Sequence, residues 1–217
     1  MRYVDLSHEI EDGMITYKGL PAPLICDFLS RSDSRLQYEG ETSFQIGQVE
    51  MVGNTGTYID CPFHRFADGK DFSTLFISDL ADLVSLRIDA PYQEGLAIGR
   101  SHFEGLNLEN KAILIHTGWS THWRTDRYFE DHPFLTAEAA ELIKEGGAKV
   151  VGIDSHNIDD TNQKNRPVHT TLLGANICIV EHMCQLHLIP PKGGFFTAVP
   201  PKLRGMGSFP VRAFVKF

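Results

Sequence analysis

Apolar residues along this chain fall mostly into short continuous runs and strict alternations, which is the pattern of β-strands. Continuous runs such as residues 112–115 predict strands buried on both faces of a sheet. Residues 44–51 alternate in two registers that change at Gly47, which predicts a strand with a bulge there. The predicted strands are residues 3–6, 44–51, 83–88, 112–115, 149–153, 177–180 and 213–215.

Helical patterns are few. Thr136 precedes an amphipathic run that stops at Gly146, which predicts a capped helix. Residues 167–175 predict a second helical turn, and Ser101 with Glu104 has the spacing of a capping box. Glycine and proline at residues 19–23 and polar residues at 32–42 predict loops. Strands dominate, so the chain is expected to form one mixed α/β or α+β domain over residues 1–217.

Composition narrows the classes of function. The net charge is 20 − 28 = −8, which argues against a nucleic-acid partner. No apolar run approaches the roughly 20 residues of a membrane span, and the first residues lack a signal-peptide core. The four cysteines form no paired motif, which predicts reduced thiols and a cytoplasmic protein. We expect a small-molecule substrate, with neither nucleic acid nor membrane as partner.

The segment from Gly53 to His64 carries the densest group of chemically active side chains. Asn54, Tyr58, Asp60 and His64 occupy even positions, so an extended backbone would point all four to one side. An amide, a phenol, a carboxylate and an imidazole on one face predict the lining of a reactive pocket. The alternative is a turn entering a strand, with the aspartate bound to its own amides.

Two later residues extend this group. His169 lies in the second helical segment and Glu181 ends the strand that follows it, so both can converge with Asp60 where loops gather. These three side chains suit Zn²⁺ or Mn²⁺, and His64 is the natural group to move protons. Taken singly, Glu181 could be a surface charge and His169 a helix cap. Cys61 is a thiol near His64, but its odd position turns it away from the pocket.

The segment resembles the signature His-x-Gly-Thr-His-x-Asp-x-Pro-x-His of the metal-dependent cyclase/hydrolase family, which includes bacterial kynurenine formamidase and isatin hydrolase. The glycine, threonine, aspartate, proline and last histidine are present at residues 54–64. Further matches occur in order at residues 5–8, 11–14, 117–119, 132–133, 152–154, 167–169, 172–173, 181 and 210–213. The resemblance therefore covers nearly the whole chain.

The resemblance implies a compact single α/β domain with a barrel-like mixed β-sheet flanked by helices, assembled as a homodimer or larger homo-oligomer. It implies hydrolysis of a small amide, lactone or cyclic carbonyl compound. In the family, the two leading motif histidines and the aspartate bind one metal ion. The aspartate, a later histidine and a glutamate bind a second, and the last motif histidine, here His64, transfers protons.

The chain departs from the signature where the first metal binds. Asn54 and Tyr58 replace both leading histidines, and neither an amide nor a neutral phenol is a good zinc ligand. This predicts loss or weakening of the first site, with one Zn²⁺ or Mn²⁺ ion held by Asp60, His169 and Glu181. Asn54 and Tyr58 would then donate hydrogen bonds to substrate or oxyanion.

Two other functions compete with a metal-dependent hydrolase. A metal-free family member could bind a small ligand without turnover. A metal-independent lyase or isomerase could use His64 and Tyr58 as an acid–base pair. The sequence names neither the substrate nor a role for His156.

Overall fold

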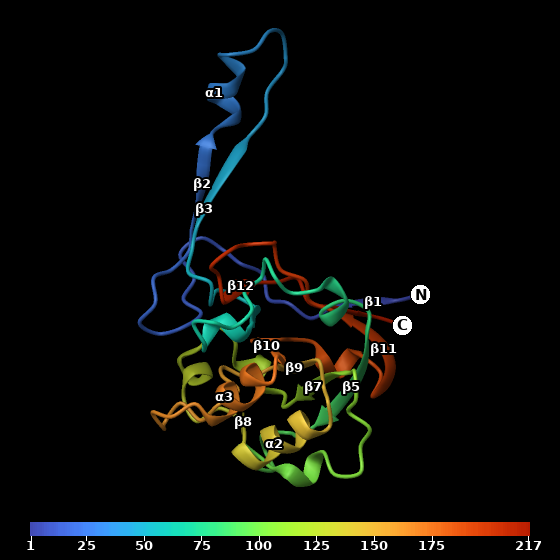
Figure 1. Ribbon diagram of the computed structural model, residues 1–217. Helices are drawn as coiled ribbons and strands as arrows, with labels where there is room; N and C mark the ends of the chain where they lie inside the picture. The colour runs from blue at the N-terminus through green and yellow to red at the C-terminus, as the bar shows by residue number, and fades with distance from the viewer.

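The computed structural model describes residues 1–217 (Figure 1). Its strands are β1 Tyr3–Asp5, β2 Leu24–Leu29, β3 Ile46–Glu50, β4 Tyr58–Asp60, β5 Leu83–Asp89, β6 Ala97–Ile98, β7 Ala112–His116, β8 Phe134–Leu135, β9 Val150–Ile153, β10 Cys178–Glu181, β11 Lys192–Thr197, β12 Ser208–Pro210 and β13 Phe214–Lys216. The α-helices are α1 Arg31–Arg35, α2 Ala137–Glu145 and α3 Pro167–Gly174. Short 3₁₀ turns are η1 Pro62–His64, η2 Ile77–Asp79, η3 Arg100–His102, η4 Trp119–His122, η5 Asp126–Phe129 and η6 Leu186–Leu188.

A curled nine-stranded sheet in the order β1-β13-β11-β5-β7-β9-β10-β4-β12 organises the body. Its centre, β5-β7-β9-β10, is parallel, and the strands on both sides of this centre pair antiparallel. The compact α/β fold with a barrel-like mixed sheet is therefore confirmed. None of the helices combines the length and apolar character that a membrane crossing needs.

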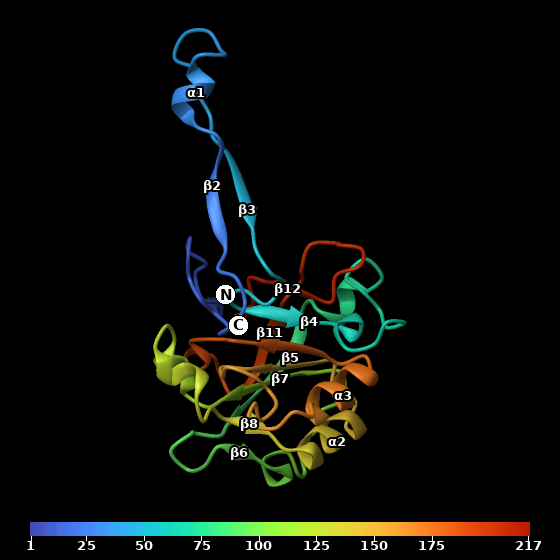
Figure 2. The ribbon, with the colours of Figure 1, turned by 90° about the vertical axis from the view of Figure 1, so that its left-hand side faces the viewer.

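The central strands are apolar on both faces because both faces are covered. Ile113 and Ile115 of β7 pack toward α2 and α3, which lie together on one side of the sheet (Figure 2). Leu114 points the other way, into a second cluster with Val180 and Phe196. The continuous apolar runs in the sequence reflect this two-sided burial.

The predicted central strands and the two main helices are confirmed. Thr136 caps α2, where its hydroxyl accepts a hydrogen bond from the Ala139 amide. The capping-box prediction at Ser101 is wrong: η3 begins at Arg100 after Gly99 and has no side-chain cap. Residues 192–197 and 208–210 form strands that the pattern did not reveal.

Residues 24–50 form an arm that leaves the body (Figures 1 and 2). The expectation of a loop at residues 32–42 is wrong over its first four residues, which belong to α1; Ser30 caps this helix through the Asp33 amide. The strand at residues 44–51 is confirmed as β3, and its partner is the unpredicted β2. The pairing register shifts between Asp27 and Leu29, so the irregularity lies opposite Gly47, in the neighbouring strand.

Candidate active site

A cavity of about 290 Å³ opens beside β4, β10 and α3. All six side chains singled out in the sequence line it: Asn54, Tyr58, Asp60, His64, His169 and Glu181. The cavity is also lined by Tyr17, Leu20, Arg65, Asn157 and Arg166. The sequence therefore located the right segments, and the structure brings them together across a separation of more than a hundred residues.

The motif reaches the cavity by two kinds of backbone. Tyr58 and Asp60 lie in β4 and share a face, as period-two geometry requires. The expectation of an extended backbone up to His64 is wrong, because Pro62 begins the turn η1 and this turn returns His64 to the cavity. Cys61 lies in the core behind the strand, and burial raises its pKa to about 11. This thiol is therefore no nucleophile for the cavity.

Asp60 is fully buried, and its two oxygens have different surroundings. Ser208 stands opposite Asp60 in the neighbouring β12, and its hydroxyl donates to Oδ1. The same hydroxyl lies 2.7 Å from Nδ1 of His64. Because the serine proton goes to Asp60, the serine oxygen accepts from Nδ1–H, and this leaves Nε2 of His64 with its lone pair. Asp60 Oδ2 has no hydrogen-bond partner.

His169 is held at the start of α3 by Asp159. The Asp159 carboxylate accepts from the Val168 and His169 amides, so it caps the helix from outside. It also lies 2.6 Å from Nδ1 of His169, which orients Nε2 toward Asp60 and Glu181 at 3.5 and 3.7 Å. Burial lowers the pKa of His169, but the bond to Asp159 and the other two carboxylates outweigh it and raise the pKa to about 10.

Glu181 is buried opposite Tyr58 on the paired strand β10. The tyrosine hydroxyl and the Ile158 amide donate to its two carboxylate oxygens. Burial and the nearby Asp60 raise the pKa of Glu181 to about 7, against the opposing effect of His169. Burial beside Glu181 also holds the pKa of Tyr58 well above its usual value, so Tyr58 is a neutral donor.

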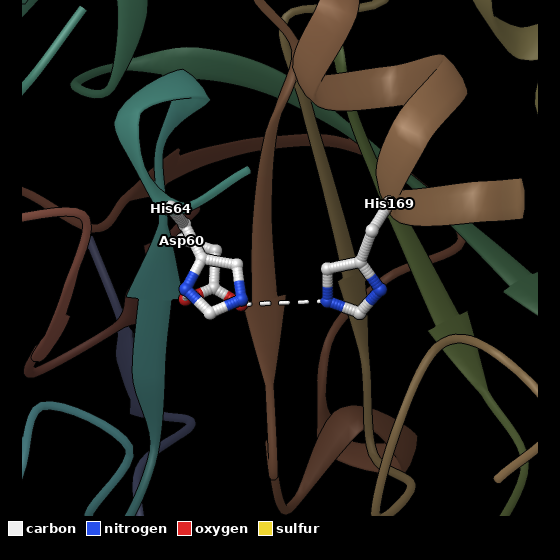
Figure 3. A group of neighbouring side chains, drawn as sticks. All are labelled: Asp60, His64 and His169. Atoms are coloured by element: carbon white, nitrogen blue, oxygen red, sulfur yellow. Dashed lines mark ion pairs between the residues drawn. The ribbon is translucent and has the colours of Figure 1, made fainter. Parts of the chain in front are cut away.

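The donor atoms fit a divalent cation. Asp60, His64 and His169 each offer a ligand atom, and these atoms lie within 4.8 Å of one another (Figure 3). Asp60 Oδ2 supports this, because it is buried and accepts no hydrogen bond, and its charged neighbour is Nε2 of His169, 3.5 Å away. Glu181 borders this group through His169. The structure thus contains a possible Asp–His–His metal site.

Several residues of the site gave no readable signal in the sequence. Ser208 lies 144 residues after His64 and becomes its neighbour only through the pairing of β12 with β4. Asp159 precedes α3, and an acidic residue before a helix is too common to indicate a site. Arg166 adjoins the Pro167 start of α3, and its proximity to His169 was the one usable clue.

Gly207 has no side chain, and this lets its backbone lie directly against the backbone of His64. A β-carbon there would lie 2.4 Å from the His64 amide nitrogen and 2.5 Å from its Cα. We expect Gly207→Ala to lower the free energy of unfolding by about 1–3 kcal/mol, because the strand must move away from η1. Thermal unfolding measures this. Gly99→Ala is the control, since nothing lies within 4 Å of its added carbon; equal melting temperatures of the two variants would contradict the prediction.

Buried neutral histidines predict acid sensitivity. Burial lowers the pKa of His156 to about 3, and this ring packs among His132, His182 and Tyr128. The unfolded chain binds the proton near pH 6.5 and the folded chain does not, so this contribution to stability is lost as the pH falls below about 6.5. His156→Phe removes the titration.

Denaturant unfolding between pH 7 and pH 4 tests this effect as a difference between proteins. We expect the free energy of unfolding of wild type, minus that of His156→Phe, to fall by up to about 1.4 kcal/mol per pH unit. Taking the difference cancels the groups that titrate in this range and lie away from His156. The exposed His102 provides the control His102→Phe. A constant difference over the whole pH range would refute the assignment.

The chain matches proteins of one family over its whole length. The family model Cyclase, described as "Putative cyclase", matches residues 4–160. The chain is 27% identical to the kynurenine formamidase of Bacillus mycoides (strain KBAB4) over 217 residues, 99% of this chain and 97% of that protein. It is 28% identical to the kynurenine formamidase of Bacillus anthracis over 218 residues, with the same coverage.

Solved structures of other proteins share the fold of this chain. A protein described as a "Potential Metal-Dependent Hydrolase With Cyclase Activity" superposes with a TM-score of 0.80 at 25% identity, covering 99% of this chain and 96% of that one. Isatin hydrolase A from Labrenzia aggregata superposes with a TM-score of 0.83 at 19% identity, covering 99% and 93%. At 19% identity, the similarity to isatin hydrolase A shows a common fold and nothing about activity.

Proposed function

The chain belongs to the Cyclase family, and from this membership we propose that it is a hydrolase of a small amide, lactone or cyclic carbonyl compound. The observation that carries the proposal is the buried Asp60 Oδ2, which accepts no hydrogen bond at the wall of a polar cavity and lies 3.5 Å from Nε2 of His169. The name kynurenine formamidase denotes an enzyme that cleaves an amide. Full-length similarity to proteins of this name therefore supports cleavage of a carbon–nitrogen bond.

We assign Asp60, His169 and Glu181 to one divalent ion, zinc or manganese, with His64 beside them. When bound, such an ion supplies polarisation of the substrate carbonyl and acidifies water. Asp159 supports this set from outside, because its contact with Nδ1 holds the His169 ring with Nε2 toward Asp60, where a bound ion would take the place of the Nε2 proton. The chemistry of a carboxylate-rich set with one or two imidazoles favours these borderline ions.

His64 is the group we assign to proton transfer. Its Nδ1–H is held by Ser208, so Nε2 can take a proton from the attacking water and return it to the leaving nitrogen or oxygen. Asp60 stabilises the imidazolium through the serine hydroxyl. His64 is partly exposed, with 36% of its side chain accessible, which leaves room for substrate above it.

Asn54 and Tyr58 take different roles in this proposal. The phenol proton of Tyr58 goes to Glu181, so Tyr58 holds that carboxylate in place. The Asn54 amide lines the same cavity and is the group that we assign to the substrate carbonyl or oxyanion. Arg65 and Arg166 also line the cavity and add positive charge near the three carboxylates of the site. We also propose a cytoplasmic location, which suits four unpaired cysteines.

Metal content, measured after purification without chelator or metal-affinity resin, tests this function. About one zinc or manganese ion per chain, with hydrolysis of an amide or lactone panel abolished by chelation, is the expected result. Absence of metal together with absence of stabilisation by any added divalent ion would refute the metal-dependent mechanism.

The metal-independent rival makes a different prediction for Tyr58. If Tyr58 and His64 form an acid–base pair, Tyr58→Phe abolishes turnover and chelation has no effect. In our proposal, Tyr58→Phe leaves Glu181 without one donor, lowers the free energy of unfolding by about 1–3 kcal/mol and leaves chelator-sensitive activity. The activity of the variant with and without chelator separates the two, and Tyr3→Phe, far from the cavity in β1, is the control.

A further inference from the structure

Two arginines in the wall of the cavity carry positive charge that no carboxylate of the chain neutralises. Arg65 and Arg166 both line the cavity. The ion pairs that arginines of this chain form lie elsewhere, and neither of these two takes part in one. Asp60 and Glu181 line the same cavity, but their ion pairs are with histidines. Both guanidinium groups are therefore available to a negative charge on a ligand.

The chain holds both guanidinium groups in place. Nε of Arg65 donates to the Thr170 hydroxyl at 3.2 Å, so the side chain reaches from the end of η1 to α3. Nη1 of Arg166 donates to backbone carbonyls of the loop before α3, at Gln163 and Asn165. Each anchor uses one of the three guanidinium nitrogens, so donors remain for a ligand. Groups that are already oriented lose less conformational freedom when they bind.

An ion in the proposed metal site would leave this cavity positive. A metal-bound imidazole is neutral, so His169 would then contribute no charge. Asp60, Glu181 and Asp159 supply three negative charges, and the two arginines with a divalent ion supply four positive ones. One unit of positive charge is left over, which attracts an anionic substrate and repels a cationic one.

The available donors favour a carboxylate over a phosphate. Phosphate sites commonly use the backbone amides at a helix N-terminus. At the start of α3 the Val168 and His169 amides already donate to Asp159, so they are not free for a ligand. A guanidinium group presents parallel N–H groups that match the two oxygens of a planar carboxylate.

The rest of the wall indicates a small ligand with an apolar body. Tyr17 and Leu20 line the cavity, and the Tyr17 ring packs 4.6 Å from the His156 ring. Burial and the charge of Glu181 raise the pKa of Tyr17, and the charge of Arg166 opposes this rise, so the arginine lies close to the phenol. The cavity volume of about 290 Å³ is at the small end for ligand pockets, which suits one aryl ring or a short alkyl chain.

We propose that Arg65 and Arg166 form a carboxylate subsite, so that the substrate is a small amide, lactone or cyclic carbonyl compound that also carries a carboxylate group. Arg65 directly follows His64, and Arg166 lies three residues before His169. A carboxylate held there leaves the other end of the same small molecule beside His64 and Asn54, which line the same cavity. The inference rests on the proposed hydrolase function for the bond that reacts, whereas binding of the carboxylate needs no turnover.

Isothermal titration calorimetry with stable ketones tests the subsite without turnover. The probes are the ortho, meta and para isomers of acetylbenzoate, each compared with the nitroacetophenone of the same substitution. A nitro group has the shape of a carboxylate and no net charge, and neither compound contains a bond that a hydrolase cleaves. We expect wild type to bind at least one acetylbenzoate about 10-fold to 100-fold more tightly than its nitro counterpart, because hydrogen bonds to a charged group are the stronger ones.

Variants of the two arginines show whether they cause this preference. Arg65→Gln and Arg166→Gln should each reduce the preference for the acid at least about threefold, and the double variant should abolish it. Binding of the nitroacetophenones should stay within about twofold of wild type in all of them, since these probes carry no charge for the arginines to attract. Arg100→Gln is the matched control, because Arg100 is exposed and pairs with Glu104 on the surface. Melting temperatures establish that each variant is folded.

Three results would overturn the carboxylate subsite. The first is no preference for the acid in any of the three pairs, including no binding of either probe. The second is a preference that survives in the double variant, which would place the carboxylate on the ion or elsewhere. The third is displacement of bound acetylbenzoate by inorganic phosphate at lower concentration than by benzoate, which would assign the arginines to phosphate.

The same measurements separate the subsite from the hydrolase assignment. Arginine-dependent binding of an acetylbenzoate, without hydrolysis of any carboxylate-bearing amide or lactone, would refute the hydrolase and leave the subsite in place. Hydrolysis of neutral amides by a protein that shows no preference for the acid would refute the subsite and leave the hydrolase.

Discussion

Replacing His64 with alanine is expected to lower kcat by about 100-fold to 10,000-fold, which is the usual contribution of a general acid–base group. The reason lies in the hydrogen-bond chain from Nδ1 of His64 through the Ser208 hydroxyl to Asp60. This chain fixes the proton on Nδ1 and leaves Nε2 as the base beside the cavity. Steady-state kinetics on a substrate found by screening measures the loss, and added imidazole should restore part of it.

Two further variants show whether His64 acts through this chain. Ser208→Ala should lower kcat less than His64→Ala does, because the imidazole keeps its place and loses only the link to Asp60. His102→Ala, at an exposed histidine far from the cavity, should match wild type. Unaltered hydrolysis in the His64 variant would exclude the role, and equal loss in all three would indicate a general folding defect.

The sequence located most of the site because its chemistry is concentrated in one strand and its neighbours. Period-two geometry placed Tyr58 and Asp60 correctly, because a buried strand has only two faces. It failed for the route to His64, since a 3₁₀ turn after Pro62 also returns a side chain to the cavity. The local pattern could not distinguish these two paths.

The missing parts of the site depend on tertiary pairing. Ser208 and Asp159 act only because β12 pairs with β4 and because residue 159 lies over the first turn of α3. Only half of the arm was predicted. Alternation at residues 44–51 indicated β3, whereas β2 was missed, because both of its faces lie in water and it lacks the one-sided hydrophobic pattern that identifies a strand.

Replacing Asp60 with asparagine is expected to remove both the metal ion and the activity, with a loss of at least about 100-fold, since even residues behind metal ligands cost 10-fold to 100-fold. Asparagine has nearly the same shape and can still bind the Ser208 hydroxyl through its amide oxygen. It lacks the negative charge at the buried Oδ2, which accepts no hydrogen bond and lies 3.5 Å from Nε2 of His169. The change therefore removes a ligand while it preserves the packing of β4.

The clearest measurement combines metal content with melting temperature before and after metal addition. At a free metal concentration about 100 times the dissociation constant, wild type should gain about 2.7 kcal/mol, and Asp60→Asn should gain nothing and melt close to chelated wild type. Asp68→Asn, at an exposed carboxylate a few residues later, should keep the whole gain. An Asp60 variant that retains metal and its stabilisation would place the ion elsewhere. If wild type takes up no ion, we would assign His64 to a metal-free reaction, because its hydrogen bond to Ser208 does not depend on an ion.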